Sequence, residues 1–258
     1  MDEDIWTQCH GIHYLTSYHG TVWRLVQTQE VIATRKLVDS LEEQAILEEL
    51  IHSSISPHDD QYADFHPLLT TPFRYPPLTY GSRFGKKTER ALWYGSLDIA
   101  TIMAEKAFYQ FNFIHASDVE FGTIEIPITI FSAQIKTDRA IKLTDLPFSK
   151  YKKIISSPDS YAASQALGAS MRKDKIDAFT FHSARDPQHG TNLALFTPTP
   201  FIHKKPDHHS FQSWECIATT HLVEFIRSSS YYADAYSFPV ETFYVNEALP
   251  LFPADNLL

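Results

Sequence analysis

Cysteine and long apolar runs are both scarce in this chain. It contains only Cys9 and Cys216, which lie far apart and outside any C-x-x-C pair. This excludes a disulfide framework and favours a reducing compartment. No apolar run reaches the roughly 18 residues of a membrane span. The acidic start, Met1 to Asp4, lacks the basic and apolar regions of a signal peptide. We therefore expect a cytoplasmic protein that does not contact membranes.

Basic residues are also few. The chain has 22 Lys and Arg against 31 Asp and Glu, a formal net charge of −9. So acidic a protein is a poor binder of polyanions, and we expect no direct nucleic-acid binding. One small anion is different, because two or three placed arginines suffice to hold it. His10, His13 and His19 lie near Cys9, but their spacing fits no zinc pattern, so no metal is expected.

The motifs of the common nucleotide-binding folds are missing as well. There is no G-x-x-x-x-G-K-[ST] phosphate loop, no G-x-G-x-x-G after a strand and no G-x-S-x-G turn. A dinucleotide would therefore be a substrate rather than a Rossmann-bound cofactor. Aromatic residues are abundant at 14%. They fill protein cores, and they also line pockets for flat ring ligands.

The hydrophobic patterns predict intermixed strands and helices within one domain of residues 1–258. Strands are expected at residues 20–26, 92–95, 122–135, 176–182 and 192–197, and helices at residues 40–51, 97–111 and 161–171. Ser96 is expected to cap the second helix, and Pro127 indicates an edge or bulged strand. Residues 52–80, rich in proline, are expected to form a long ordered loop. Without a regular βαβ alternation, the fold class is α+β, a mixed sheet with flanking helices.

Two blocks of sequence carry the candidate site. The first contains P-F-R-Y-P-P (residues 72–77), G-S-R-F-G (81–85), W-Y-G (93–95) and A-E (104–105), and the second contains S-A-R (183–185) and G-T-N-L-A-L-F (190–196). Glycines bracket Arg83, so the backbone there can approach a ligand, and the planar guanidinium matches a phosphate. Tyr94 and Glu105 follow at steps of eleven positions. A loop, strand and helix of that length can bring the three side chains to one cleft. Each residue taken alone also fits an ordinary structural role.

Taken in order, these motifs resemble the RES domain, which is named for its arginine, glutamate and serine. The resemblance covers about residues 21–198 and leaves additions at both ends. It implies that the catalytic residues are Arg83, Tyr94, Glu105 and Ser183. Residues expected to contribute to substrate binding are Arg24, Arg74, Tyr75, Phe84, Arg185 and Asn192. Phe84 stands where the family usually has a tryptophan.

The resemblance also implies a fold related to ADP-ribosyltransferases, NAD⁺ as the substrate with no separate cofactor, and control by a helix-turn-helix (Xre-type) antitoxin. Cleavage of the nicotinamide–ribose bond develops positive charge on the ribose carbon. Glu105 is expected to stabilise that charge, as acidic residues do in glycoside cleavage. Arg83, with Arg24 or Arg74, would hold the pyrophosphate.

Tyr94 would stack on a ring or bind the ribose, and Ser183 would contact the nicotinamide ribose or amide. The acceptor of the ADP-ribosyl group stays open between water, phosphate and a macromolecule such as a protein side chain. Two alternatives remain beside this toxin hypothesis. One is an ADP-ribosyltransferase that modifies a protein or nucleic acid. The other is a non-enzymatic module whose arginines dock an anionic partner.

Overall fold

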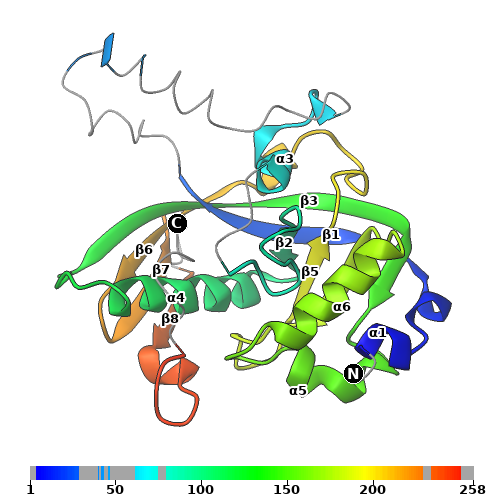
Figure 1. The fold of residues 1–258 in the computed structure, drawn as a ribbon. Helices are drawn as coiled ribbons and strands as arrows, with labels where there is room; N and C mark the ends of the chain where they lie inside the picture. The colour runs from blue at the N-terminus through cyan, green and yellow to red at the C-terminus, as the bar shows by residue number, and fades with distance from the viewer. Residues whose placement is uncertain are drawn as a thin grey trace.

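A computed structural model shows one mixed sheet with helices on both of its sides (Figure 1). It describes residues 4–28, 40, 42, 43, 46, 62–74, 80–228 and 234–250. The strands are β1 (Thr16–Gln27), β2 (Trp93–Ser96), β3 (Ile124–Lys142), β4 (Ala178–His182), β5 (Thr191–Leu195), β6 (Gln212–Ala218), β7 (Leu222–Arg227) and β8 (Ala235–Pro239). The α-helices are α1 (Ile5–Gln8), α3 (Pro67–Arg74), α4 (Ile99–His115), α5 (Lys152–Ile155) and α6 (Ala162–Lys173). Short 3-10 helices are η1 (Gly11–Tyr14), η4 (Phe148–Tyr151), η5 (His208–Ser210) and η6 (Val240–Phe243).

The eight strands run in the order β1-β2-β5-β4-β3-β6-β7-β8, and β1 pairs with β3 as well. This extra pairing closes the first five strands into a ring, while β6, β7 and β8 extend β3 as an open sheet. Among the strands that the structure describes, only β3 and β4 pair in parallel. The predicted α+β class, a mixed sheet with flanking helices, is confirmed.

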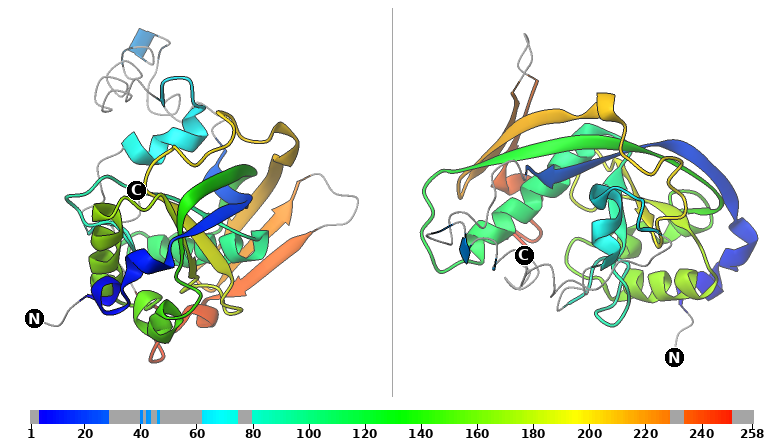
Figure 2. Two further views of the ribbon diagram at one scale, coloured as in Figure 1. Left: turned by 90° about the vertical axis from the view of Figure 1, so that its right-hand side faces the viewer. Right: turned by 90° about the horizontal axis from the view of Figure 1, so that it is seen from above.

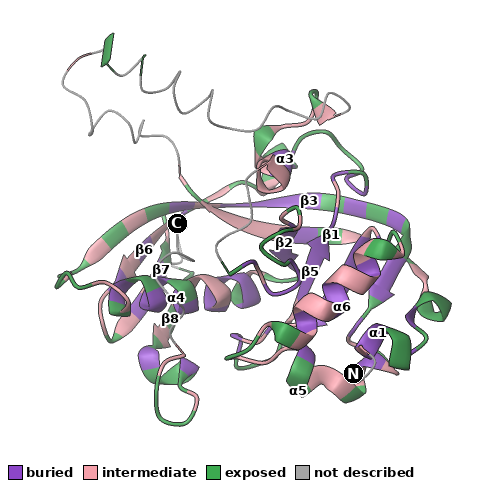
Figure 3. Cartoon of the chain, in the orientation of Figure 1, coloured by how far each residue is buried: buried purple, intermediate pink, exposed green. Residues whose placement is uncertain are grey.

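Helices cover opposite sides of this sheet. Figures 1 and 2 show α3 on one side of the β1–β3 pair and both α4 and α6 on the other. The core divides accordingly into three apolar clusters, one under α6, one under α4 and one between α3 and the ring. Burial alternates near both ends of β3, whereas residues 130–133 in its middle are all buried, and α4 buries most of its residues (Figure 3). No helix among the described residues is long and apolar enough to cross a membrane.

Several local predictions need correction. Asp98, not Ser96, caps the helix after β2: its carboxylate accepts the Thr101 N–H at 2.9 Å, and Ser96 ends the strand. The expected long loop contains α3, whose Pro67 suits a first helical position because no N–H partner is needed there. Of the helix expected at residues 40–51, only isolated residues are described. There, Ser40 Oγ accepts the Glu43 N–H at 3.1 Å.

Pro127 does not mark an edge strand, because β3 pairs with both β1 and β6. The ladder with β1 ends at Gln27, which pairs with Ile128. The Pro127 carbonyl accepts the Thr28 N–H at 2.9 Å, so its imide nitrogen faces the same side, just beyond that ladder. An interior strand therefore tolerates the missing donor.

Candidate functional site

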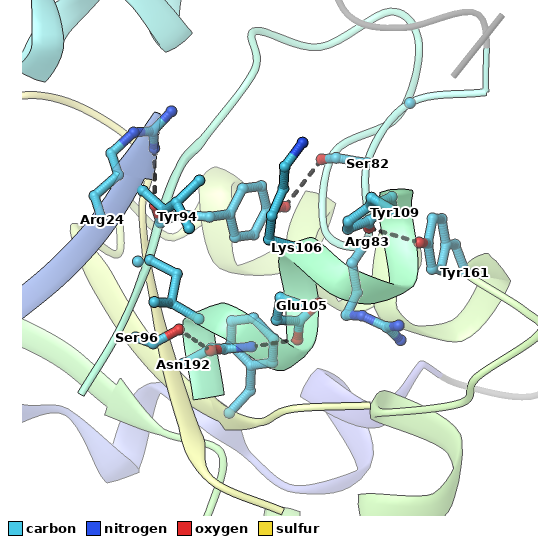
Figure 4. Close-up of a pocket in the computed structure, with 15 residues that line it drawn as sticks. Arg24, Ser82, Arg83, Tyr94, Ser96, Glu105, Lys106, Tyr109, Tyr161 and Asn192 are labelled. Carbon is cyan, nitrogen blue, oxygen red and sulfur yellow. Dashed lines mark hydrogen bonds between the residues drawn. The ribbon is translucent and has the colours of Figure 1, made fainter. Parts of the chain in front are cut away.

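Glu105 is held from two sides by neutral donors. It projects from α4, and its Oε1 accepts a hydrogen bond from Ser183 Oγ at 2.6 Å and another from Asn192 Nδ2 at 2.7 Å (Figure 4 shows the second). Its Oε2 has no hydrogen-bond partner among the described residues. One carboxylate oxygen is thus fixed by the protein, and the other is available to a ligand.

The sheet places both donors. Asn192 on β5 pairs in register with Ser96 on β2, and Ser96 Oγ donates to Asn192 Oδ1 at 2.6 Å. Ser183 directly follows β4, where its Oγ accepts the backbone N–H groups of Arg185 at 3.1 Å and Asp186 at 2.9 Å. Neighbouring strand ends therefore converge on a single glutamate of the helix that packs beside them.

The hydrogen bonds of Ser183 argue against its expected contact with the substrate. A serine hydroxyl offers one donor and two acceptor positions. The Ser183 hydroxyl donates to Glu105 and accepts from two backbone N–H groups, and the residue is 1% exposed. In this geometry the Ser183 hydroxyl contacts Glu105 and the backbone, and it does not line the cavity.

Arg83 lies in a tight turn. Gly81 has a φ of +74°, and a Cβ there would collide with the carbonyl oxygen of Gly85, so this position requires glycine. The Arg83 side chain is 8% exposed, its Nη1 donates to the Ser157 carbonyl at 2.7 Å, and its guanidinium carbon lies 4.8 Å from the centre of the Tyr161 ring. No carboxylate among the described residues forms an ion pair with Arg83. Its guanidinium is therefore able to bind an anionic ligand.

Tyr94 fastens this turn to β2. Its hydroxyl accepts the Phe84 N–H at 3.2 Å and lies 2.9 Å from Ser82 Oγ. Burial raises the pKa of Tyr94 to about 12, so the phenol stays neutral at physiological pH.

Arg24 on β1 reaches the same strand. Its Nη1 donates to the Tyr94 carbonyl at 2.8 Å, and its guanidinium carbon lies 5.1 Å from the centre of the Trp93 ring. Burial lowers the pKa of Arg24 to about 10, which still leaves it charged at neutral pH. Its Nε is buried without a hydrogen-bond partner. This second cation is thus held at the site at some cost in desolvation.

These side chains line a cavity of about 420 Å³ (Figure 4). Of the described residues that line it, Arg24, Arg83 and Lys106 are cationic and only Glu105 is acidic. The aromatic lining residues are Tyr94, Tyr109, Tyr161 and Phe181. Within the described part of the chain, no three His, Cys, Asp or Glu side chains group as metal ligands.

The structure brings part of the predicted set together. Arg83, Tyr94 and Glu105 line the cavity, as do Arg24 and Asn192 among the expected binding residues. Ser183 reaches the cavity only through Glu105. The sequence-based prediction of one cleft for the arginine, the tyrosine and the glutamate agrees with this arrangement.

Other predicted binding residues lie elsewhere. The Phe84 ring is fully buried, with its centre 4.7 Å from the ring centres of both Phe179 and Phe181, so it is a core residue rather than a substrate contact. Arg185 is also buried, and its guanidinium carbon lies 3.5 Å from the centre of the Phe108 ring. Arg74 ends α3, on the far side of the sheet from α4, and does not line the cavity (Figure 1). Tyr75 lies outside the described residues.

The structure adds residues that the sequence analysis did not select. Tyr109 lies four positions after Glu105, a helical spacing that places both on one face of α4. That spacing could have identified it. Tyr161 could not be found in this way, because it comes from the start of another helix, and its hydroxyl lies 3.2 Å from that of Tyr109. Burial raises the pKa of Tyr109 well above its ordinary value, and the neighbouring Tyr161 and Glu105 raise it further.

Comparison with known proteins identifies one family. The model of the RES domain matches residues 53–216. One of the solved structures that the chain resembles is the MbcT–MbcA toxin–antitoxin complex of M. tuberculosis, with 11% sequence identity and a TM-score of 0.43. That match covers 83% of this chain and 91% of the other. No curated protein matches the chain.

Proposed function

Because this chain belongs to the RES domain family, we propose that it cleaves the bond between nicotinamide and ribose in NAD⁺, with water or phosphate as the acceptor. One observation carries the proposal. Among the described residues that line the cavity, Glu105 is the one carboxylate, has one unengaged oxygen, and is accompanied by three cationic and four aromatic side chains. NAD⁺ combines the groups that such a cavity suits, namely a pyrophosphate, flat rings and a sugar carbon that becomes positive.

The cations account for the pyrophosphate. Arg24, Arg83 and Lys106 outnumber Glu105 in the cavity lining, although the whole chain carries a net charge of −9. None of the three forms an ion pair with a described carboxylate, and Lys106 Nζ donates to the amide oxygen of Gln110 at 3.0 Å. An arginine provides the two-pronged contact that phosphate oxygens favour. The local excess of positive charge therefore favours a doubly charged anion.

Glu105 accounts for the bond cleavage. As the C–N bond breaks, its electron pair leaves with the nicotinamide nitrogen, which becomes neutral, and the ribose carbon becomes positive. A carboxylate oxygen beside that carbon stabilises the charge, as in glycoside hydrolysis. Water then bonds to the carbon and releases a proton, which gives nicotinamide and ADP-ribose. Phosphate in place of water would give the 1-phosphate of ADP-ribose.

The tyrosines account for the ring systems of the substrate. Tyr94 keeps its proton, because burial raises its pKa to about 12. Its ring, together with those of Tyr109 and Tyr161, lines the cavity and offers flat apolar surface to nicotinamide or adenine.

An assay with purified protein tests the proposal. The protein is incubated with NAD⁺ labelled on the adenine, and both released nicotinamide and the fate of the label are measured. Glu125→Gln, which changes an exposed strand carboxylate, is the matched control for Glu105→Gln. Nicotinamide release with the label on ADP-ribose or its phosphate, lost only in the Glu105 variant, supports the proposal. Label on a macromolecule would indicate a transferase instead. No release of nicotinamide would refute NAD⁺ cleavage.

We also propose that the chain is a toxin that an Xre-type helix-turn-helix antitoxin neutralises in the cytoplasm. An enzyme that destroys a central metabolite requires external control. Inducing the wild type in bacteria should lower NAD⁺ before growth stops, whereas Glu105→Gln should do neither. Equal toxicity of both proteins, or a harmless wild type with unchanged NAD⁺, would contradict the toxin hypothesis.

A further inference from the structure

We propose that Asn192 and Ser96 form a positioning pair that orients Glu105, and that Asn192 acts through this carboxylate rather than by binding the substrate. The proposal rests on the proposed function only for its activity measurements. The sequence analysis expected Asn192 to be a binding residue, and it does line the cavity. Its hydrogen bonds indicate a different role.

The carboxylate of Glu105 determines which atoms donate and which accept in the hydrogen bonds that join Glu105, Asn192 and Ser96. A carboxylate oxygen only accepts, so Asn192 must present its Nδ2 to Glu105, at 2.7 Å. The Asn192 Oδ1 then faces Ser96 Oγ at 2.6 Å, and the serine must donate. Asn192 is 5% exposed and Ser96 is 2% exposed. The two residues thus form a buried chain of donors that ends on the carboxylate.

The same carboxylate oxygen also accepts from Ser183 Oγ at 2.6 Å. Two donors from different strand ends fill the acceptor positions of Oε1, which leaves Oε2 as the oxygen able to face a ligand. A glutamate side chain has several rotatable bonds, and two fixed donors restrict it to one orientation. Catalytic groups need such support, because small misplacements of the reacting oxygen slow the reaction.

The sheet makes this pair rigid. Ser96 and Asn192 are directly opposed on β2 and β5, and Asn192 also pairs with Phe181 on β4. The amide therefore extends from a central strand with partners on both sides. Glu105 lies on a helix that packs against β1, β2 and β7. The hydrogen bond between Asn192 and Glu105 is consequently a direct link between the sheet and the helix at the cavity.

Kinetics of Asn192→Ala and Ser96→Ala separate positioning from substrate binding. We expect Asn192→Ala to lower kcat by about 10-fold or more while KM for NAD⁺ changes by less than about twofold. Ser96→Ala should lower kcat less, and Ser96→Thr, which keeps a hydroxyl, should restore it. Asn112→Ala is the matched control: Asn112 is a buried asparagine of α4 whose Nδ2 donates to the Phe108 carbonyl. It should leave kcat unchanged.

The affinity of catalytically inactive variants for NAD⁺ tests the alternative that Asn192 binds the substrate directly. Calorimetry should give the same dissociation constant for NAD⁺ with Glu105→Gln and with the double variant that adds Asn192→Ala. Weaker binding by about fivefold or more in the double variant would show a direct substrate contact and overturn the proposal.

Crystal structures give a test that does not need activity. In Asn192→Ala we expect the Glu105 carboxylate to turn or to adopt two conformers, while the strands keep their positions. A Glu105 that stays in place in this variant would overturn the positioning role, whether or not the wild type cleaves NAD⁺. A wild type that releases no nicotinamide would refute the proposed function alone.

Discussion

Replacing Glu105 by glutamine should remove NAD⁺ cleavage and leave the fold intact. Glutamine has the shape of glutamate, and its carbonyl oxygen can accept both hydrogen bonds that Oε1 receives from Ser183 at 2.6 Å and Asn192 at 2.7 Å. The side-chain NH₂ group then takes the place of Oε2. The substitution thus exchanges a negative acceptor for a neutral donor at the oxygen position that has no described partner.

The expected loss of activity follows from this exchange. Removing one preorganised electrostatic contact from a transition state costs about 10²- to 10³-fold in kcat, or about 2.7–4 kcal/mol. A donor facing the positive ribose carbon is repulsive, so the effect should lie at the upper end of that range. The free energy of unfolding should change by less than about 1 kcal/mol, because both buried donors keep an acceptor.

Glu105→Ala provides the contrast. It leaves the donors of Ser183 and Asn192 without their acceptor, at about 1–3 kcal/mol for each buried group. The alanine variant should therefore be both inactive and less stable, whereas the glutamine variant should be inactive only. Nicotinamide release and urea unfolding, measured on the same preparations, separate the two effects.

Two results would refute this reasoning. Near wild-type nicotinamide release by Glu105→Gln would remove the carboxylate charge from the mechanism. Equal loss of stability in the glutamine and alanine variants would show that Ser183 and Asn192 are not anchored on Oε1 in solution.

Three further predictions concern the residues around Glu105. Arg83→Lys should weaken NAD⁺ binding about 10-fold or more, because lysine lacks the planar fork; unchanged affinity on the Glu105→Gln background would place the anchor elsewhere. Since burial raises the pKa of Tyr94 from 10 to about 12, its neutral phenol contributes stability that is complete below pH 10 and is lost as pH rises to about 12. Between pH 10 and about 12, the urea midpoint should therefore fall less steeply with pH for Tyr94→Phe than for the wild type. Identical slopes would contradict the raised pKa of Tyr94. Arg24→Met should raise the free energy of unfolding by about 1 kcal/mol, because burial lowers the pKa of Arg24 to about 10 and disfavours the charged form, while NAD⁺ affinity falls. A lower melting temperature for Arg24→Met would contradict the prediction that the buried charge of Arg24 lowers stability.

Local patterns in the sequence predicted strands β1 to β5 and helices α4 and α6, but they did not predict β6, β7 and β8. The strict alternation of isoleucines predicted the strand that became β3, and the helix formers after residue 96 predicted α4. Both signals depend on side-chain periodicity along one segment, which folding does not alter. The turn around Arg83 could also be predicted from its flanking glycines, and Gly81 does have a backbone conformation that favours glycine. The ends of helices and strands were harder to predict, because Asp98 and Ser96 are equally good capping residues.

The roles of the site residues depended on contacts between distant segments. By itself, the sequence determined the chemistry available, namely the arginine, tyrosine and glutamate at spaced positions and the family to which they belong. Only the tertiary structure decided that Phe84 fills the core, that Ser183 and Asn192 share one oxygen of Glu105, and that Tyr161 faces the cavity. The physical reason is that strand register and burial arise from pairing and packing across the whole chain, so they leave no periodic signal near the residues that they position.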